Sequence, residues 1–123
     1  MKDVVIVGGV RTPIGGHGGA FRTLTAQHLA ALVFREVIER VGIDPLLFDD
    51  VILGCIGQQS DAVNIGRVAG LLAGVPVNVP GYTVQRNCVS GMQSITSACQ
   101  AIQAGDGEVF LSGGTESMST SPY

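Results

Sequence analysis

The chain of 123 residues contains no tryptophan, and aromatic residues make up only 5% of it. Charged residues are also few, at 14%, and Lys and Arg form no cluster, so neither nucleic acid nor an anionic membrane surface is an expected partner. No apolar run approaches the length of a membrane span, and the N-terminus lacks the pattern of a secretory leader. We therefore expect a cytoplasmic protein that acts on small molecules or other proteins.

Cysteine and histidine are too sparse for most sites built from them. Cys55, Cys88 and Cys99 are an odd number, form no CxxC pair, and have no histidine at zinc-ligand spacing. His17 and His28 likewise lack a partner at the spacing of a metal site or a catalytic triad. Because neither GxGxxG nor GxxxxGK[ST] occurs, nucleotide binding is also disfavoured. We expect no metal site, no structural disulfide and no permanently bound cofactor.

The sequence does contain an alternation of strand-like and helix-like segments, within a composition that is 46% hydrophobic. Short apolar runs rich in β-branched residues predict strands over residues 4–9, 50–57, 81–86 and 107–114. Apolar spacing of three to four residues, with Thr25 or Asn64 before a helix and glycine after one, predicts helices over residues 25–42, 64–74 and 90–105. The resulting βαβαβαβ order predicts a layered α/β fold with largely parallel strands, in which residues 4–9 form a central strand.

Cys88 differs from the other cysteines because it falls between the predicted strand 81–86 and the predicted helix 90–105. Its sulfur would lie at the positive end of the helix dipole, where Gly91 leaves room for a close approach. A helix terminus alone stabilises a thiolate too little to ionise an ordinary thiol at pH 7, so a base is still required. This local argument leaves a nucleophile and a buried apolar filler both open for Cys88. For Cys55 and Cys99 it favours plain burial.

Four stretches of the chain together resemble the thiolase family, in the order and at about the spacing found there. They are NCVSGMQSI around Cys88, RTPIGG (11–16), GGTESMSTSPY (113–123) and GQQSDAVNIGRVAGLLAGVP (57–76), the last of which includes Asn64 and Arg67. Ketoacyl synthases share the arrangement of strand, cysteine and helix, but GGTESMS together with RTPIG favours thiolases. The chain departs from the usual thiolase pattern at Gln85 and Val89.

The resemblance implies a thiolase-like layered fold and a role for Cys88 as nucleophile. Cys88 would accept the acyl group of an acyl-CoA, and the resulting thioester would be attacked by the carbanion of a second acyl-CoA or by free CoA. The substrates would thus be coenzyme A thioesters, and the reaction either acetoacetyl-CoA formation or thiolysis of a 3-ketoacyl-CoA. The resemblance also implies a homo-oligomer, either a dimer through the strand region 81–86 or a tetramer.

The same resemblance predicts that residues 1–123 are an incomplete thiolase N-terminal domain, with the loop domain and the C-terminal domain absent. The family's activating histidine, its asparagine and its second cysteine would then lie elsewhere, so we expect the isolated chain to be catalytically incomplete. Its exposed sheet edge would favour association or instability. One alternative is a non-catalytic truncated thiolase-like subunit or assembly partner. Another is a ketoacyl synthase relative that acts on carrier-protein substrates.

Overall fold

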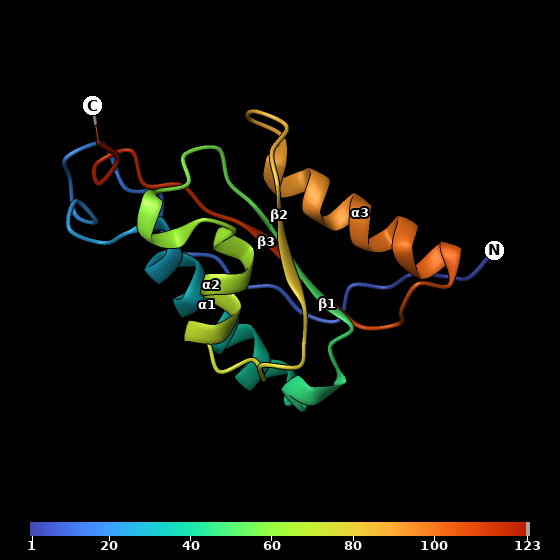
Figure 1. The fold of residues 1–123 in the computed structure, drawn as a ribbon. Coiled ribbons are helices and arrows are strands. Elements are labelled where there is room, and N and C mark those ends of the chain that lie inside the picture. Colours follow the sequence, from blue (N-terminus) through green and yellow to red (C-terminus); the bar gives the residue numbers. More distant parts are fainter. Residues whose placement is uncertain (123) are drawn as a thin grey trace.

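The computed structural model describes residues 1–122, which form a three-stranded parallel sheet covered by helices on both faces. The strands are β1 (Asp50–Gly54), β2 (Gly81–Val84) and β3 (Phe110–Gly114), in the spatial order β2-β1-β3. Helix α3 (Ser90–Ala104) lies on one face of the sheet, and α1 (Ala26–Val41) and α2 (Ile65–Leu72) lie on the other (Figure 1). The predicted layered α/β class with parallel strands is confirmed.

The helix boundaries follow the local signals of the sequence closely. The hydroxyl of Thr25 accepts a hydrogen bond from the backbone N–H of His28 at the start of α1, and Gly42 ends that helix in the left-handed conformation with a φ of 71°. Asn64 precedes α2 as predicted, but its side chain does not cap the helix. Instead its amide donates to the carbonyl of Gly81 at 3.0 Å and its oxygen accepts from Thr83, which fastens α2 to β2.

Strand β1 is the centre of the sheet and is buried on both faces, as its unbroken apolar run indicates. Val51 and Leu53 belong to the apolar core shared with α1 and α2, in which Phe34 and Ile65 are fully buried. Side chains alternate along a strand, so Ile52 and the position of Gly54 face α3 instead. Helix α3 is therefore held against the same strand whose other face packs on α1 and α2.

The predicted strand over residues 4–9 was wrong: no strand is formed there. Val5, Ile6 and Val7 are 74–79% exposed, and within residues 1–122 no backbone hydrogen bond joins this segment to the sheet. A β-branched apolar run becomes a strand only where a neighbour supplies hydrogen-bond partners, and this segment pairs with none. The observed order thus begins with α1, and from that helix onward the predicted alternation is confirmed.

Candidate active site

The carboxyl ends of the three strands meet at one edge of the sheet, as they must in a parallel sheet. Cys88 follows β2, residues 55–57 follow β1, and the polar run 115–121 follows β3. The structure places Cys88 in the turn between β2 and α3, two residues before the first residue of the helix, as the sequence predicts. Its side chain is exposed and forms no disulfide. This edge is the usual position for a site in an open α/β sheet.

The turn that carries Cys88 is held together by its neighbours. The buried hydroxyl of Ser90 accepts from the backbone N–H of Arg86 at 2.8 Å and donates to the carbonyl of Asn87 at 2.6 Å. The N–H of Asn87 donates to the side-chain oxygen of Gln85 at 2.7 Å, so the unusual Gln85 stabilises a residue with a φ of 50°. Within residues 1–122 no hydrogen bond reaches the Cys88 thiol. The turn is therefore fixed while its thiol stays accessible.

The start of α3 favours negative charge near Cys88. Val89 occupies the position before the helix, and its apolar side chain cannot accept from the N–H groups of the first turn. The N–H of Ser90 donates to the carbonyl of Asn87 at 3.2 Å, so the uncapped N–H groups are those that follow it. These groups form the positive end of the helix dipole, which favours a thiolate or a developing oxyanion. The ring and backbone N–H of His28 contact Thr25 and not Cys88. Within residues 1–122, then, the helix dipole favours ionisation of the thiol, but no basic side chain forms a hydrogen bond with it.

Cys55 and Cys99 do not join this site. Cys55 is 1% exposed, and its Sγ lies 3.4 Å from Oε2 of Glu116. Burial, together with the Glu116 carboxylate, raises the pKa of the Cys55 thiol to about 12, so this cysteine stays protonated at neutral pH. The predicted burial of Cys55 is thus confirmed. Cys99 is partly buried on α3. In residues 1–122 no group of three His, Cys, Asp or Glu side chains is arranged to hold a metal ion.

Glu116 is a structural residue that the sequence analysis missed, since it entered there only as part of the GGTESMS motif. Both of its carboxylate oxygens accept the backbone N–H groups of Ile56 and Gly57, at 3.0 to 3.3 Å. The following Ser117 donates to the carbonyl of Leu24 at 2.8 Å. The motif therefore fastens the loop after β1 to the segment after β3. A single acidic residue in a polar run directly after a buried strand was the available signal.

We predict that Glu116→Gln lowers the free energy of unfolding by about 1–3 kcal/mol. The amide keeps the size of the side chain but loses the charge-assisted bonds from Ile56 and Gly57, and its NH₂ group faces donors. Urea unfolding followed by circular dichroism measures the change. Glu108→Gln is the matched control, because it removes the same charge from an exposed side chain at the other end of β3. Equal effects of the two changes would contradict the role of Glu116.

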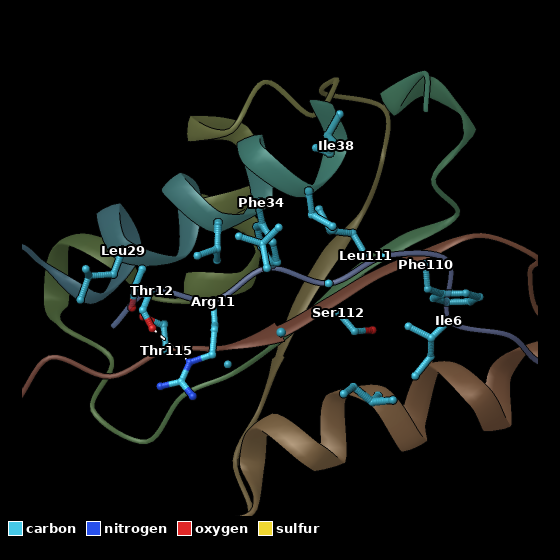
Figure 2. Close-up of a pocket in the computed structure, with 18 of the residues that line it drawn as sticks. Ile6, Arg11, Thr12, Leu29, Phe34, Ile38, Phe110, Leu111, Ser112 and Thr115 are labelled. Atoms are coloured by element: carbon cyan, nitrogen blue, oxygen red, sulfur yellow. Dashed lines mark hydrogen bonds between the residues drawn. The ribbon is translucent and has the colours of Figure 1, made fainter. Parts of the chain in front are cut away.

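A cavity of about 1100 Å³ lies away from Cys88. The N-terminal segment, α1, β3 and α3 line it, and Figure 2 shows Ile6, Phe34 and Leu111 among the lining side chains. Cys99 lines this cavity and Cys88 does not. It is the space between the unpaired N-terminal segment and the free edge of β3, and it is separate from the turn that carries the exposed thiol.

In the part of the chain that the structure describes, no helix has both the length and the apolar character needed to span a membrane.

Comparison with known proteins gives one consistent result. The family model described as the thiolase N-terminal domain matches residues 4–123. The chain is 46% identical over 125 residues to the 3-oxoadipyl-CoA/3-oxo-5,6-dehydrosuberyl-CoA thiolase of Escherichia coli K12, covering 100% of this chain and 31% of that protein. It is 38% identical over 122 residues to the acetyl-CoA acetyltransferase of Syntrophomonas wolfei, covering 99% of this chain and again 31% of the relative. The chain thus spans about a third of the length of the curated relatives it matches.

A solved structure agrees with the sequence matches. The crystal structure of the Bacillus anthracis acetyl-CoA acetyltransferase superimposes with a TM-score of 0.93 at 50% sequence identity. The alignment covers 97% of this chain and 30% of that one.

Proposed function

The chain belongs to the thiolase family, and we propose that Cys88 is the residue that takes the acyl group from an acyl-CoA. The observation that carries the proposal is the position of this thiol. It is exposed, has no hydrogen-bond partner within residues 1–122, and precedes a helix whose first N–H groups lack a side-chain cap. Related proteins of the same fold are named as acetyl-CoA acetyltransferase and as CoA thiolases, which supports acyl-CoA as the substrate class.

The proposed first step is a thioester exchange. The Cys88 thiolate attacks the carbonyl carbon of the acyl-CoA, the bond from that carbon to the CoA sulfur breaks, and CoA leaves as a thiolate that takes up a proton. The new acyl–Cys88 bond is again a thioester of similar energy, so the step runs in either direction. In the tetrahedral intermediate of this exchange, the former carbonyl oxygen carries a negative charge. N–H groups at the start of α3 and the helix dipole stabilise that charge. CoA thioesters are thus substrates, and none is a resident cofactor.

The second step needs groups that we place outside residues 1–122. Forming a carbon–carbon bond requires a base that removes a weakly acidic proton beside a thioester carbonyl, and an oxyanion site for the enolate. Within the described residues no hydrogen bond joins Cys88 to a basic side chain. We propose that this chain forms the nucleophile-bearing part of an N-terminal domain, and that a loop domain and a C-terminal domain supply the base and most of the CoA contacts. The curated relatives are about three times as long as this chain, which supports the division.

A burst experiment tests the proposed first step. The purified protein is mixed with excess acetyl-CoA, and the CoA released is measured by chromatography against time. We expect the release to level off at about one equivalent of CoA per chain, because each chain carries one Cys88, and to be slow, because without a base only a small fraction of this thiol is ionised. Absence of release would contradict acyl transfer by this chain and favour the assembly role.

We also propose that the chain pairs with a second copy along β2. This strand lies at an edge of the sheet, and Tyr82 on it is 39% exposed. Val51 donates to the carbonyl of Pro80 and Leu53 is in register with Thr83, so in this parallel ladder the N–H of Thr83 points away from β1. Within residues 1–122 no hydrogen bond reaches that N–H. An unpaired edge of this kind is a template for another strand.

Thr83→Pro is expected to abolish this association, because proline removes the N–H that faces the free edge while the ladder to β1 stays intact. Sedimentation velocity at several protein concentrations measures the change. The control is Thr83→Val, which keeps the N–H but loses the hydroxyl that contacts Asn64 and Gly66. Association that survives in the proline variant, or is lost equally in both, would contradict pairing through this edge.

A further inference from the structure

Gly54 and Gly114 stand at the carboxyl ends of β1 and β3, and the backbone conformation of neither one requires glycine. Neither has the positive φ that favours this residue. Glycine is required because the backbone of α3 leaves no room for a side chain at either position. A Cβ at Gly54 would lie 2.3 Å from the carbonyl carbon and oxygen of Ser90 and 2.6 Å from the backbone nitrogen of Gly91. A Cβ at Gly114 would lie 2.9 Å from the Cα of Gly91.

The atoms that lie so close to these two glycines belong to the first turn of α3. They are backbone atoms, so no side-chain rotation can make room, and either the helix or the strand must move. The strand is the less movable partner: the N–H of Cys55 donates to Val84 at 3.2 Å, and the carbonyl of Gly54 accepts from Thr115 at 3.0 Å. Any side chain at position 54 or 114 therefore pushes the start of α3 away from the sheet.

Displacement of the helix start carries Cys88 with it. Ser90 lies in the first turn of α3, and its hydroxyl bonds to both Arg86 and Asn87 on the other side of the cysteine. The turn and the helix start thus form one hydrogen-bonded unit. A displacement of about 1 Å at a reacting group can cost about a hundredfold in rate, because near-attack geometry is lost.

We propose that Gly54 and Gly114 are positioning residues for the nucleophile, a role that rests on the proposed function of Cys88. They let the helix start lie directly on the strand ends, and this contact sets where the thiol stands relative to the edge of the sheet. Neither glycine touches the substrate, and each acts only through the backbone of Ser90 and Gly91.

The test compares Gly54→Ala and Gly114→Ala with Gly70→Ala in single-turnover acetyl transfer from acetyl-CoA. Gly70 is a buried glycine of α2 whose added Cβ would lie 3.6 Å from Val51, an ordinary contact. We expect the maximal rate constant to fall at least about tenfold in the first two variants and to stay within about threefold in the third. We also expect the acetyl-CoA concentration that gives half the maximal rate to stay within about threefold in all of them.

Alkylation of Cys88 by iodoacetamide separates positioning from loss of structure. This reaction needs an exposed thiol but no oriented acyl-CoA, so we expect its rate to stay within about threefold in every folded variant. Circular dichroism confirms folding. If Gly54→Ala does not fold, Gly114→Ala alone is compared with Gly70→Ala. The added Cβ of Gly114→Ala would lie 2.9 Å from its nearest neighbour instead of 2.3 Å, so its clash is milder. Folded variants that transfer acetyl as fast as the unmodified protein would overturn the proposal.

The failure of the proposed function would be recognised separately, as absence of acetyl transfer in the unmodified protein. The positioning claim is then decided by the amide resonances of residues 86–91 in heteronuclear NMR spectra. We expect these resonances to move in Gly54→Ala and Gly114→Ala and to stay in place in Gly70→Ala. Resonances that move in none of the three variants would overturn the positioning claim.

Discussion

Gly66→Ala is expected to lower the free energy of unfolding by about 1–3 kcal/mol, although alanine is ordinarily the better helix former. The reason is the direct contact of α2 with β2. A Cβ at Gly66 would lie 2.3 Å from the carbonyl oxygen of Tyr82, 2.9 Å from its carbonyl carbon and 3.3 Å from the Cβ of Leu53. The oxygen is a backbone atom of a paired strand, so it cannot move without disturbing the sheet.

Gly70→Ala, one turn further along α2, is the matched control. Its Cβ would meet only the side chain of Val51, at 3.6 to 3.9 Å, so the change gains helix propensity without a clash. We expect a free energy of unfolding that is unchanged or higher by up to about 1 kcal/mol. Urea titration of both variants measures the difference. Two changes of the same sign and size would contradict the close packing of α2 on β2.

Cys88→Ser is expected to slow CoA release from acetyl-CoA by at least about a thousandfold. The hydroxyl replaces the sulfur at nearly the same size, but it is not ionised at neutral pH and lacks a base to activate it. Chromatographic measurement of CoA release gives the rate, and circular dichroism checks the fold.

Cys99→Ser is the control for the Cys88 variant. It changes a partly buried thiol on the same helix that forms no part of the candidate site. We expect its rate to stay within about threefold of the unmodified protein. Comparable losses in the two variants, or none in either, would contradict the assignment of Cys88.

Local signals predicted most of the fold because they act within a few residues. Thr25 and Gly42 mark the ends of α1 through bonds to neighbours three or four residues away. The position of Cys88 between β2 and α3 was also predictable from local signals, because a short apolar run precedes it and a helix rich in small residues follows it. The order and spacing of the four motifs then identified the family, which the comparisons confirm.

Features that depend on distant parts of the chain were not predictable from local patterns. The run over residues 4–9 looks like a buried strand, but within residues 1–122 no strand pairs with it and its apolar side chains stay exposed. Glu116 bonds to Ile56 and Gly57 across about sixty positions, and no spacing in the sequence indicates this contact. The space above Gly54 is likewise set by how closely α3 approaches the sheet. Tertiary contacts decide each of these cases.

The measurement that tests the central claim most directly is mass spectrometric mapping of the protein after brief incubation with acetyl-CoA. The protein is quenched in acid, digested, and searched for an added acetyl group on each cysteine peptide. The proposed role predicts about one acetyl group per chain, on the peptide that contains Cys88, with Cys55 and Cys99 unmodified. An acetyl group on another residue, or none at all while the protein remains folded, would contradict it.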